Sequence, residues 1–132
     1  MKTHMLVLRT GDDALAAIAG FAGNKLIEGG SFSAIGAFET STIAFWNRDT
    51  KEYERIEVPE QVEVLTMTGN VAMTGNDRRL HAHVILGRRD GSTIGGHLMQ
   101  AVVRPTLEVF LVDLGMRLTR SRDEATGLWL LT

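Results

Sequence analysis

Short runs in which apolar and polar residues alternate make up most of this chain, and one segment near the N-terminus follows a different period. Alternation puts every second side chain on one face of a strand, so these runs indicate strands that are buried on one side. Val62–Met67 and Leu80–Leu86 are two examples of such strands. In residues 14–22 the apolar side chains instead recur at intervals of three and four residues, which indicates a helix with one apolar stripe.

Turn-forming residues and charges divide the chain into one helix and about eight or nine strands. The helix is expected near residues 13–23, with Asp12 or Asp13 as its N-cap, because a carboxylate there accepts hydrogen bonds from free backbone amides. Strands are expected at residues 5–8, 31–38, 42–46, 52–58, 62–73, 80–86, 93–103, 107–112 and 127–131, with a bulge or turn at Gly69-Asn70. This order predicts an α+β fold, in which one principal helix packs on a mostly antiparallel sheet.

Length and composition predict a single domain, residues 1–132, that is large enough to bury a substantial core. The chain has no cysteine, which excludes disulfides and thiolate ligands and suits a reducing cytoplasm. Arg9 and Asp12 interrupt the first apolar run, so we do not expect a signal peptide. No stretch approaches the roughly 20 apolar residues that a membrane span needs. We therefore expect a soluble, cytoplasmic protein.

The charge balance bears on nucleic-acid binding. Lysine and arginine number 14, aspartate and glutamate number 16, and the formal net charge is -2. Non-specific binding to nucleic acid depends on a basic surface that follows the phosphate backbone. Nucleic-acid binding by this chain alone is therefore not expected.

Three of the four histidines lie within seventeen residues, in segments that otherwise have the pattern of buried strands. His81 and His83 are two residues apart and therefore share one face of a strand. His97 joins them only in one register of the following hairpin. A three-residue loop, Arg89-Asp90-Gly91, places His97 opposite His83, whereas a two-residue Asp90-Gly91 loop places it opposite Val84 and on the wrong face. The clustering of the histidines favours the three-residue loop.

Three converging imidazoles are the ligand set of an open zinc site, in which a water molecule takes the fourth position. We therefore expect His81, His83 and His97 to bind a divalent metal such as zinc. The alternative is structural: the rings hydrogen-bond within a polar patch or at a subunit interface. Glu108 could orient one of the imidazoles as a hydrogen-bond acceptor, or it could be a charge at the rim of the site.

Arginine pairs flank this hairpin at both ends. Arg78-Arg79 precedes the first histidine, and Arg88-Arg89 lies at the hairpin turn. They are either solvated loop charges or the rim of a site for a small anionic ligand. No residue is identified as catalytic, because no serine lies in a nucleophile-elbow sequence and no carboxylate is clearly placed as a general base.

An ordered series of short motifs extends over nearly the whole sequence. The series comprises Gly11-Asp12, Gly36-Ala37, Glu63-Val64-Leu65 with Gly69-Asn70, His81-Ala82-His83-Val84, Gly95-Gly96-His97-Leu98 and Thr106-Leu107-Glu108-Val109. Each motif alone is weak, but their order and spacing resemble the plant and prokaryote conserved (PPC) domain. The resemblance implies a compact α+β domain that assembles as a homotrimer, with a metal held by the histidines in some prokaryotic members.

The plant proteins of this family suggest a further comparison. Their PPC domain follows AT-hook motifs, and this chain has no Arg-Gly-Arg-Pro hook. The plant segment Arg-Phe-Glu-Ile-Leu, which contacts partners, corresponds here to Gln61-Val62-Glu63-Val64-Leu65 and lacks the Arg and Phe. We therefore expect a small homotrimeric binding or regulatory module with a histidine-lined metal or ligand site. The alternatives are a metal-dependent enzyme, such as a hydrolase, and a DNA-associated protein.

Overall fold

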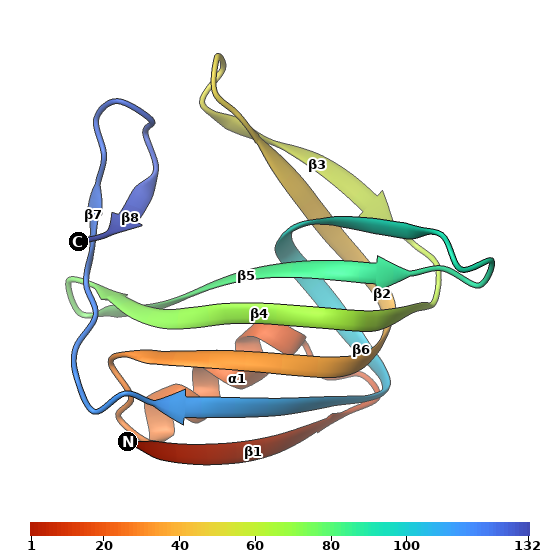
Figure 1. The fold of residues 1–132 in the computed structure, drawn as a ribbon, viewed down its shortest axis with the longest axis horizontal. Coiled ribbons are helices and arrows are strands. Elements are labelled where there is room, and N and C mark those ends of the chain that lie inside the picture. Colours follow the sequence, from red (N-terminus) through yellow and green to blue (C-terminus); the bar gives the residue numbers. More distant parts are fainter.

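The computed structural model of the protein describes residues 1–132 and contains one helix and eight strands (Figure 1). In chain order these are β1 (Lys2–Arg9), α1 (Ala14–Asn24), β2 (Gly30–Asn47), β3 (Glu52–Val58), β4 (Val62–Thr74), β5 (Asp77–Gly87), β6 (Thr93–Asp113), β7 (Arg120–Arg122) and β8 (Trp129–Leu131). All pairings between these strands are antiparallel. The predicted α+β class with one principal helix is confirmed.

The helix begins where the sequence predicts. The Asp13 side chain accepts a hydrogen bond from the Ala16 amide at 2.9 Å, so Asp13 is the N-cap. Asp12 has a different role, because its carboxylate accepts from the Arg9 amide at 2.8 Å and stabilises the turn that leads into the helix. The apolar stripe of α1 is buried against the core.

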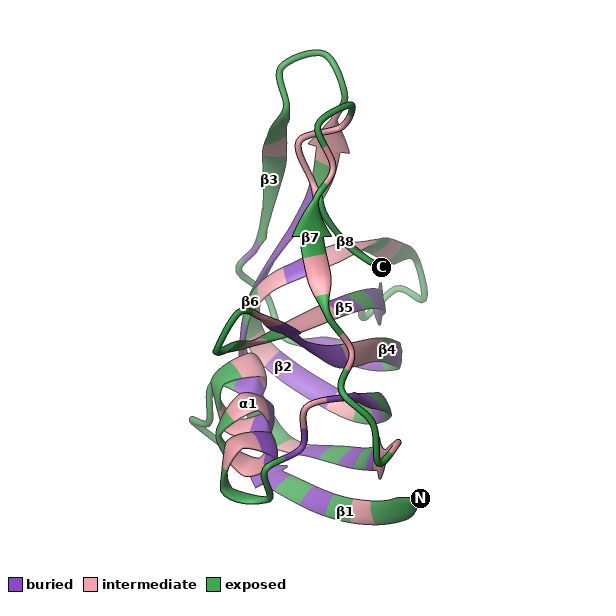
Figure 2. Cartoon of the chain, turned by 90° about the vertical axis from the view of Figure 1, so that its left-hand side faces the viewer, coloured by how far each residue is buried: buried purple, intermediate pink, exposed green.

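The main sheet has the strand order β1-β6-β5-β4-β2-β3, and β6 also pairs with β2. This extra pairing closes β6, β5, β4 and β2 into a ring, so the sheet curls around its own core. The helix α1 lies on one side of the sheet (Figure 2). A separate two-stranded sheet, β7 with β8, lies beyond it at the C-terminus.

The two faces of the sheet differ in what covers them. The helix side holds the core, in which residues such as Ile18, Met67 and Val109 are fully buried. The opposite face, which we call the open face, carries large apolar side chains that remain exposed to solvent. These are Met5, Val7, Ile35, Ile85 and Phe110, with exposed fractions from 39 to 62%.

Two strands are each longer than the sequence pattern predicts. Residues 31–38 and 42–46 belong to one strand, β2, and residues 93–103 and 107–112 belong to one strand, β6. Pro105 does not end β6, because it lies where the β2–β6 register shifts and no ladder hydrogen bond is lost there. Gly69-Asn70 does not turn the chain either. Gly69 continues β4 and lies beneath the Phe32 ring.

The C-terminal strand, in contrast, is shorter than expected. Residues 127–131 were predicted to form one strand, whereas β8 contains only the last three of them. Its partner β7 lies in a polar segment with no apolar alternation, so the pattern of the sequence does not reveal it.

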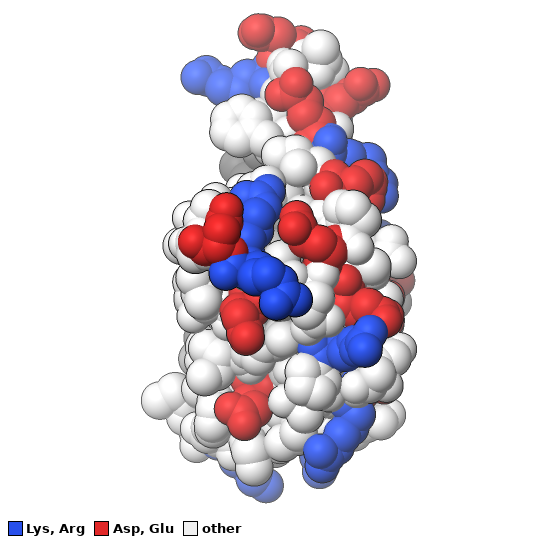
Figure 3. All heavy atoms as spheres, turned by 90° about the vertical axis from the view of Figure 1, so that its right-hand side faces the viewer, with Lys and Arg blue, Asp and Glu red and all other residues white.

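Acidic and basic side chains lie close together on at least one face of the molecule. Figure 3 views the molecule from the side on which the β5–β6 turn lies, and acidic and basic side chains are interspersed there. Ion pairs such as Arg88 with Glu60 at 3.3 Å and Arg104 with Glu39 at 3.1 Å are part of this arrangement. The structure contains no helix that is long and apolar enough to cross a membrane.

The close packing at Gly69 gives a test of the fold. A Cβ atom there would lie 2.3 Å from the His81 carbonyl oxygen and 2.5 Å from the Phe32 ring, so Gly69→Ala is expected to destabilise the protein by about 1–3 kcal/mol. Gly20→Ala, in the helix, meets open space and should stabilise by about 0.5–1 kcal/mol. Urea unfolding of both variants measures the difference. Equal effects of the two substitutions would contradict this packing.

Candidate functional site

The turn between β5 and β6 has three residues and sets the register of the site. The Arg88 amide donates to the Ser92 carbonyl at 2.8 Å, and Gly91 adopts a positive φ of 86° that favours glycine. The Asp90 carboxylate accepts from the Ser92 amide at 2.9 Å and from its hydroxyl at 2.6 Å. In this register His83 lies directly opposite His97, as the three-residue loop predicts.

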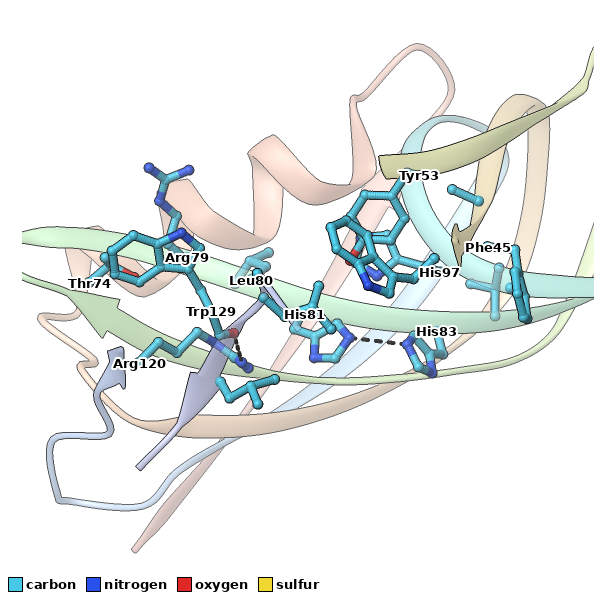
Figure 4. A pocket seen from close by; sticks show the side chains of 17 residues that line it. Phe45, Tyr53, Thr74, Arg79, Leu80, His81, His83, His97, Arg120 and Trp129 are labelled. Atoms are coloured by element: carbon cyan, nitrogen blue, oxygen red, sulfur yellow. Dashed lines mark hydrogen bonds between the residues drawn. The ribbon is translucent and has the colours of Figure 1, made fainter. Parts of the chain in front are cut away.

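The three histidines converge on the open face (Figure 4). The Nε2 atoms of His81 and His83 are 3.0 Å apart, and one ring nitrogen from each of the three residues lies within 4.8 Å of the others. The centroid of the His97 ring is 5.2 Å from that of His81 and 5.8 Å from that of His83. Sequence spacing and strand register therefore bring all three predicted side chains together.

These imidazoles have almost no hydrogen-bond partners in the chain. The only hydrogen bond that involves them joins His81 to His83, and the buried Nδ1 of His97 has no partner. Burial, with smaller effects from His81 and His83, lowers the pKa of His97 to about 4. Burial, His83 and Arg120 also lower the pKa of His81. Both rings are therefore neutral at pH 7, and their lone pairs are available as ligands.

An aromatic group extends the cluster along β2 and β3. The Tyr53 ring stacks on His97, with centroids 4.6 Å apart and an angle of 22° between the planes. Trp46 pairs with Tyr53 across the β2–β3 hairpin and packs edge-on against it at 4.9 Å. The indole Nε1 of Trp46 is buried without a hydrogen-bond partner. This hairpin extends beyond the rest of the sheet (Figure 1), and Trp46 and Tyr53 on it line one cavity with the histidines.

The opposite wall is the C-terminal hairpin, β7–β8. A cavity of about 950 Å³ lies between the two hairpins, with the three histidines in its lining. Trp46 and Tyr53 line it from β2 and β3, and Leu128, Trp129 and Leu130 line it from the C-terminal hairpin. The tips of the hairpins approach each other, since a Cβ atom on Gly127 would lie 3.5 Å from the Lys51 side chain.

Arg120 joins the C-terminal hairpin to the sheet and lines the same cavity. Its guanidinium donates to the Trp129 carbonyl at 3.0 Å and to the Asn70 side-chain oxygen at 2.6 Å. It points toward His81 (Figure 4), and its charge contributes to the lowered pKa of that ring. Burial raises the pKa of the nearby Tyr53 phenol, which stays protonated at neutral pH as a hydrogen-bond donor.

Glu108 and the Arg88-Arg89 pair were expected beside the site, but the structure places them outside the cavity lining. Glu108 pairs in register with Val7 and Ile35 and makes no hydrogen bond to any of the histidines, so it does not orient an imidazole. Arg88 lies at the β5–β6 turn and forms its ion pair with Glu60. Both arginines follow the end of β5, whereas the cavity lies beside the middle of that strand.

The other arginine pair divides between two places. Arg79 lines the cavity, and Arg78 donates to the Ile27 carbonyl at 2.6 Å on the helix side of the sheet. Successive residues of a strand face opposite ways, which explains this division.

Sequence reasoning did not identify Trp46, Tyr53, Arg120 or Trp129 as site residues. The predicted turn at Asn47–Thr50 would place Trp46 opposite Lys51. The hairpin of the structure instead pairs Asn47 with Glu52, and this register brings Trp46 opposite Tyr53. No signal existed for Arg120, a single arginine in a polar segment, because only the tertiary structure brings that segment to the histidines.

The fold and site together define a small α+β domain with a histidine cluster in a cavity beside a curled antiparallel sheet. The family model of the Plants and Prokaryotes Conserved (PCC) domain matches residues 1–115. The chain therefore belongs to this family, which confirms the resemblance seen in the sequence. Residues 116–132, which include the C-terminal hairpin, lie beyond the match. Among curated proteins, none matches the chain.

Several solved structures are similar over almost the full length. A metal-containing protein from Archaeoglobus fulgidus is 38% identical, with a TM-score of 0.93, and the match covers 100% of this chain and 94% of that one. A proposed DNA-binding protein from Bacteroides thetaiotaomicron is 29% identical, with a TM-score of 0.95 and coverage of 98% and 91%. A plant- and prokaryote-conserved protein from Pyrococcus horikoshii is 28% identical, with a TM-score of 0.91 and coverage of 98% and 92%.

The lowered pKa of His97 predicts how the metal-free protein responds to acid. The unfolded chain takes up a proton at this residue near pH 6.5, whereas the folded chain does so only near pH 4. The unfolded state therefore binds more protons between these values, and the free energy of unfolding should fall as the pH drops from about 6.5 to 4. Urea unfolding of chelator-treated protein at several pH values measures this dependence.

The matched variants are His97→Gln and His4→Gln. The first removes the shifted group and should flatten the dependence, whereas the second lies outside the cluster and should leave it as in the parent. A parent protein whose stability is constant from pH 6.5 to 4 would contradict the burial of His97.

Proposed function

We propose that the protein is a small homotrimeric binding module that holds a divalent metal, such as zinc, on His81, His83 and His97. The observation that carries this proposal is the approach of three imidazole nitrogens to within 4.8 Å of one another. Two nitrogens bound to one tetrahedral zinc lie about 3.4 Å apart, and those of His81 and His83 are already 3.0 Å apart. The fourth metal position would face the cavity and be open to exchange.

Three features of the site support metal binding over a structural role. Structural histidines usually donate a ring N–H to a backbone carbonyl or a carboxylate, whereas here His81 and His83 hydrogen-bond only with each other. His97 keeps an unpartnered buried nitrogen, which costs about 1–3 kcal/mol unless another group satisfies it. The lowered pKa values of His81 and His97 leave both rings unprotonated at pH 7, so a metal need not displace protons from them.

The exposed apolar side chains of the open face support the proposal that the protein is an oligomer. Met5, Ile35 and Phe110 are between 48 and 62% exposed on it, and no element of the chain covers them. Large apolar side chains grouped on an exposed sheet face are normally buried against another subunit, and closed symmetry is the usual arrangement. The number three comes from the family resemblance.

A binding role agrees with the site better than hydrolysis does. A metal-dependent hydrolase needs a group that activates the metal-bound water, and such a group is commonly a carboxylate. No aspartate or glutamate lines the cavity.

A DNA-associated role is suggested by the name of the Bacteroides relative. The net charge of -2 and the interspersed charges in Figure 3 oppose it.

Titration calorimetry with zinc on chelator-treated protein tests the metal site. The parent should bind about one zinc per chain. His83→Ala should weaken binding by more than about 100-fold, since loss of a ligand costs more than loss of a group that only orients one. His4→Ala, which removes the one histidine outside the cluster, should bind as the parent does. Equal affinities of the two variants would show that zinc binds elsewhere, and no binding by the parent would leave the cluster without a metal role.

Light scattering tests the assembly. Three chains of 14.5 kDa should give a particle of about 44 kDa at micromolar concentration. Phe110→Lys puts a charge in the open face and should shift the protein toward monomer. Leu26→Lys, at a residue that is 80% exposed and follows the helix, should leave the assembly unchanged. A parent protein that is monomeric would exclude the trimer.

A further inference from the structure

The charged groups of the cavity are both positive. The Arg79 and Arg120 guanidiniums line it together with three imidazoles and the hydroxyls of Tyr53 and Thr74, and no carboxylate does. Arginine and the protonated phenol donate hydrogen bonds, and a metal on the histidines would add further positive charge. A ligand that fits these groups must therefore supply acceptors and negative charge.

Arg120 has a positive charge that nothing in the chain neutralises. Its two hydrogen-bond acceptors, the Trp129 carbonyl and the Asn70 amide oxygen, are both neutral, and it forms no ion pair. The guanidinium is partly removed from water, and a desolvated charge normally has a partner of opposite sign. The Arg120 side chain points toward His81 (Figure 4). An anion beside the histidines would therefore neutralise the guanidinium and could also bind a metal held by the histidines.

The rest of the cavity wall is apolar and large. Nine of the 17 lining residues are hydrophobic, among them Trp46, Leu128, Trp129 and Leu130. A volume of about 950 Å³ is in the range of sites for small organic molecules, far more than an inorganic anion fills. The ligand therefore carries an apolar part in addition to its anionic group.

We propose that the cavity binds a small organic carboxylate, whose anionic group lies between the histidine cluster and Arg120 and whose apolar part contacts Trp46 and the C-terminal hairpin. This proposal rests on the proposed metal site, because the carboxylate would take the exchangeable fourth position. Arg120 lies on β7 and Trp129 on β8, so the C-terminal hairpin is the element that would select the ligand.

The two tryptophans of the chain give a direct readout, because both line the cavity. Benzoate is a suitable probe and benzamide its neutral analogue. Zinc-loaded protein should show a saturable change of tryptophan fluorescence with benzoate, and benzamide should bind at least about 10-fold more weakly for lack of the charge. Inorganic phosphate should also bind more weakly, since it has no apolar part.

Arg120→Gln removes the charge and keeps a donor, so it should weaken benzoate about 10-fold or more and leave benzamide unchanged. Arg122→Gln is the matched control, two residues further along β7, where the guanidinium already contacts Glu124 at 3.0 Å. Equal binding of benzoate and benzamide by the parent would overturn the proposal even if the Arg120 variant did not fold. Tighter binding of phosphate than of benzoate would overturn the proposal that the ligand has an apolar part.

Zinc binding is measured separately by calorimetry, so the two proposals fail in different ways. Zinc bound without any effect of benzoate would overturn the carboxylate site and leave the metal site standing. Benzoate bound equally well by zinc-free protein in an Arg120-dependent manner would overturn the fourth metal position as the carboxylate site and show that the anion binds through the guanidinium alone. Failure of the parent to bind zinc in calorimetry would overturn the metal site.

Discussion

The register of β6 determines every other feature of the site, because this strand hydrogen-bonds to β1, β5 and β2. His97 lies between His83 on one side and Ala44 on the other, so one strand position joins the histidine pair to the aromatic hairpin. The turn at Arg89-Asp90-Gly91 fixes that position. A shift by one residue would turn His97 to the opposite face and leave Tyr53 without its stacking partner.

The site and the open apolar face are parts of the same surface. One row of side chains crosses the four strands β6, β2, β4 and β5 on this face of the sheet. Each residue of the row pairs in register with the next, in the order Phe110, Ser33, Thr68 and His83. The core packs on the other face, which explains why polar rings can gather here without cost to the hydrophobic core. The residues that bury the helix and those that form the site alternate along the same strands.

Local patterns were sufficient to predict the parts of the structure that depend on local physics. The helix cap at Asp13 and the face shared by His81 and His83 follow from interactions over a few residues, and the structure contains both. The three-residue turn was one of two registers that the sequence permitted, and the clustering of histidines selected it correctly. The long strands were not predicted, because residues 39–41 and Pro105 interrupt the apolar pattern within strands whose partners lie far away in sequence.

The same distinction applies to the residues of the cavity. Arg88 and Arg89 are close to the histidines in sequence but lie at the end of the hairpin, whereas Arg120 is distant in sequence and points toward His81. Of the arginines close to the histidines in sequence, only Arg79 lines the cavity. Sequence proximity was therefore an incomplete guide to which cations belong to the site. What places Arg120 there is the course of the C-terminal segment, which bonds back to the sheet where the Met73 amide donates to the Leu118 carbonyl at 2.8 Å.

The chain thus builds its site from two segments that are constrained to different degrees. The histidines lie on central strands, where ladder hydrogen bonds and core packing on the opposite face hold each residue. Arg120 and Trp129 lie on a three-residue strand pair outside the main sheet and the main core. A change in the C-terminal hairpin would therefore alter the shape and charge of the cavity without moving the imidazoles. A change in β5 or β6 would disturb the core as well as the site, because successive residues of these strands face the core and the site in turn. The residues proposed to hold the metal are thus separate from those proposed to select the ligand.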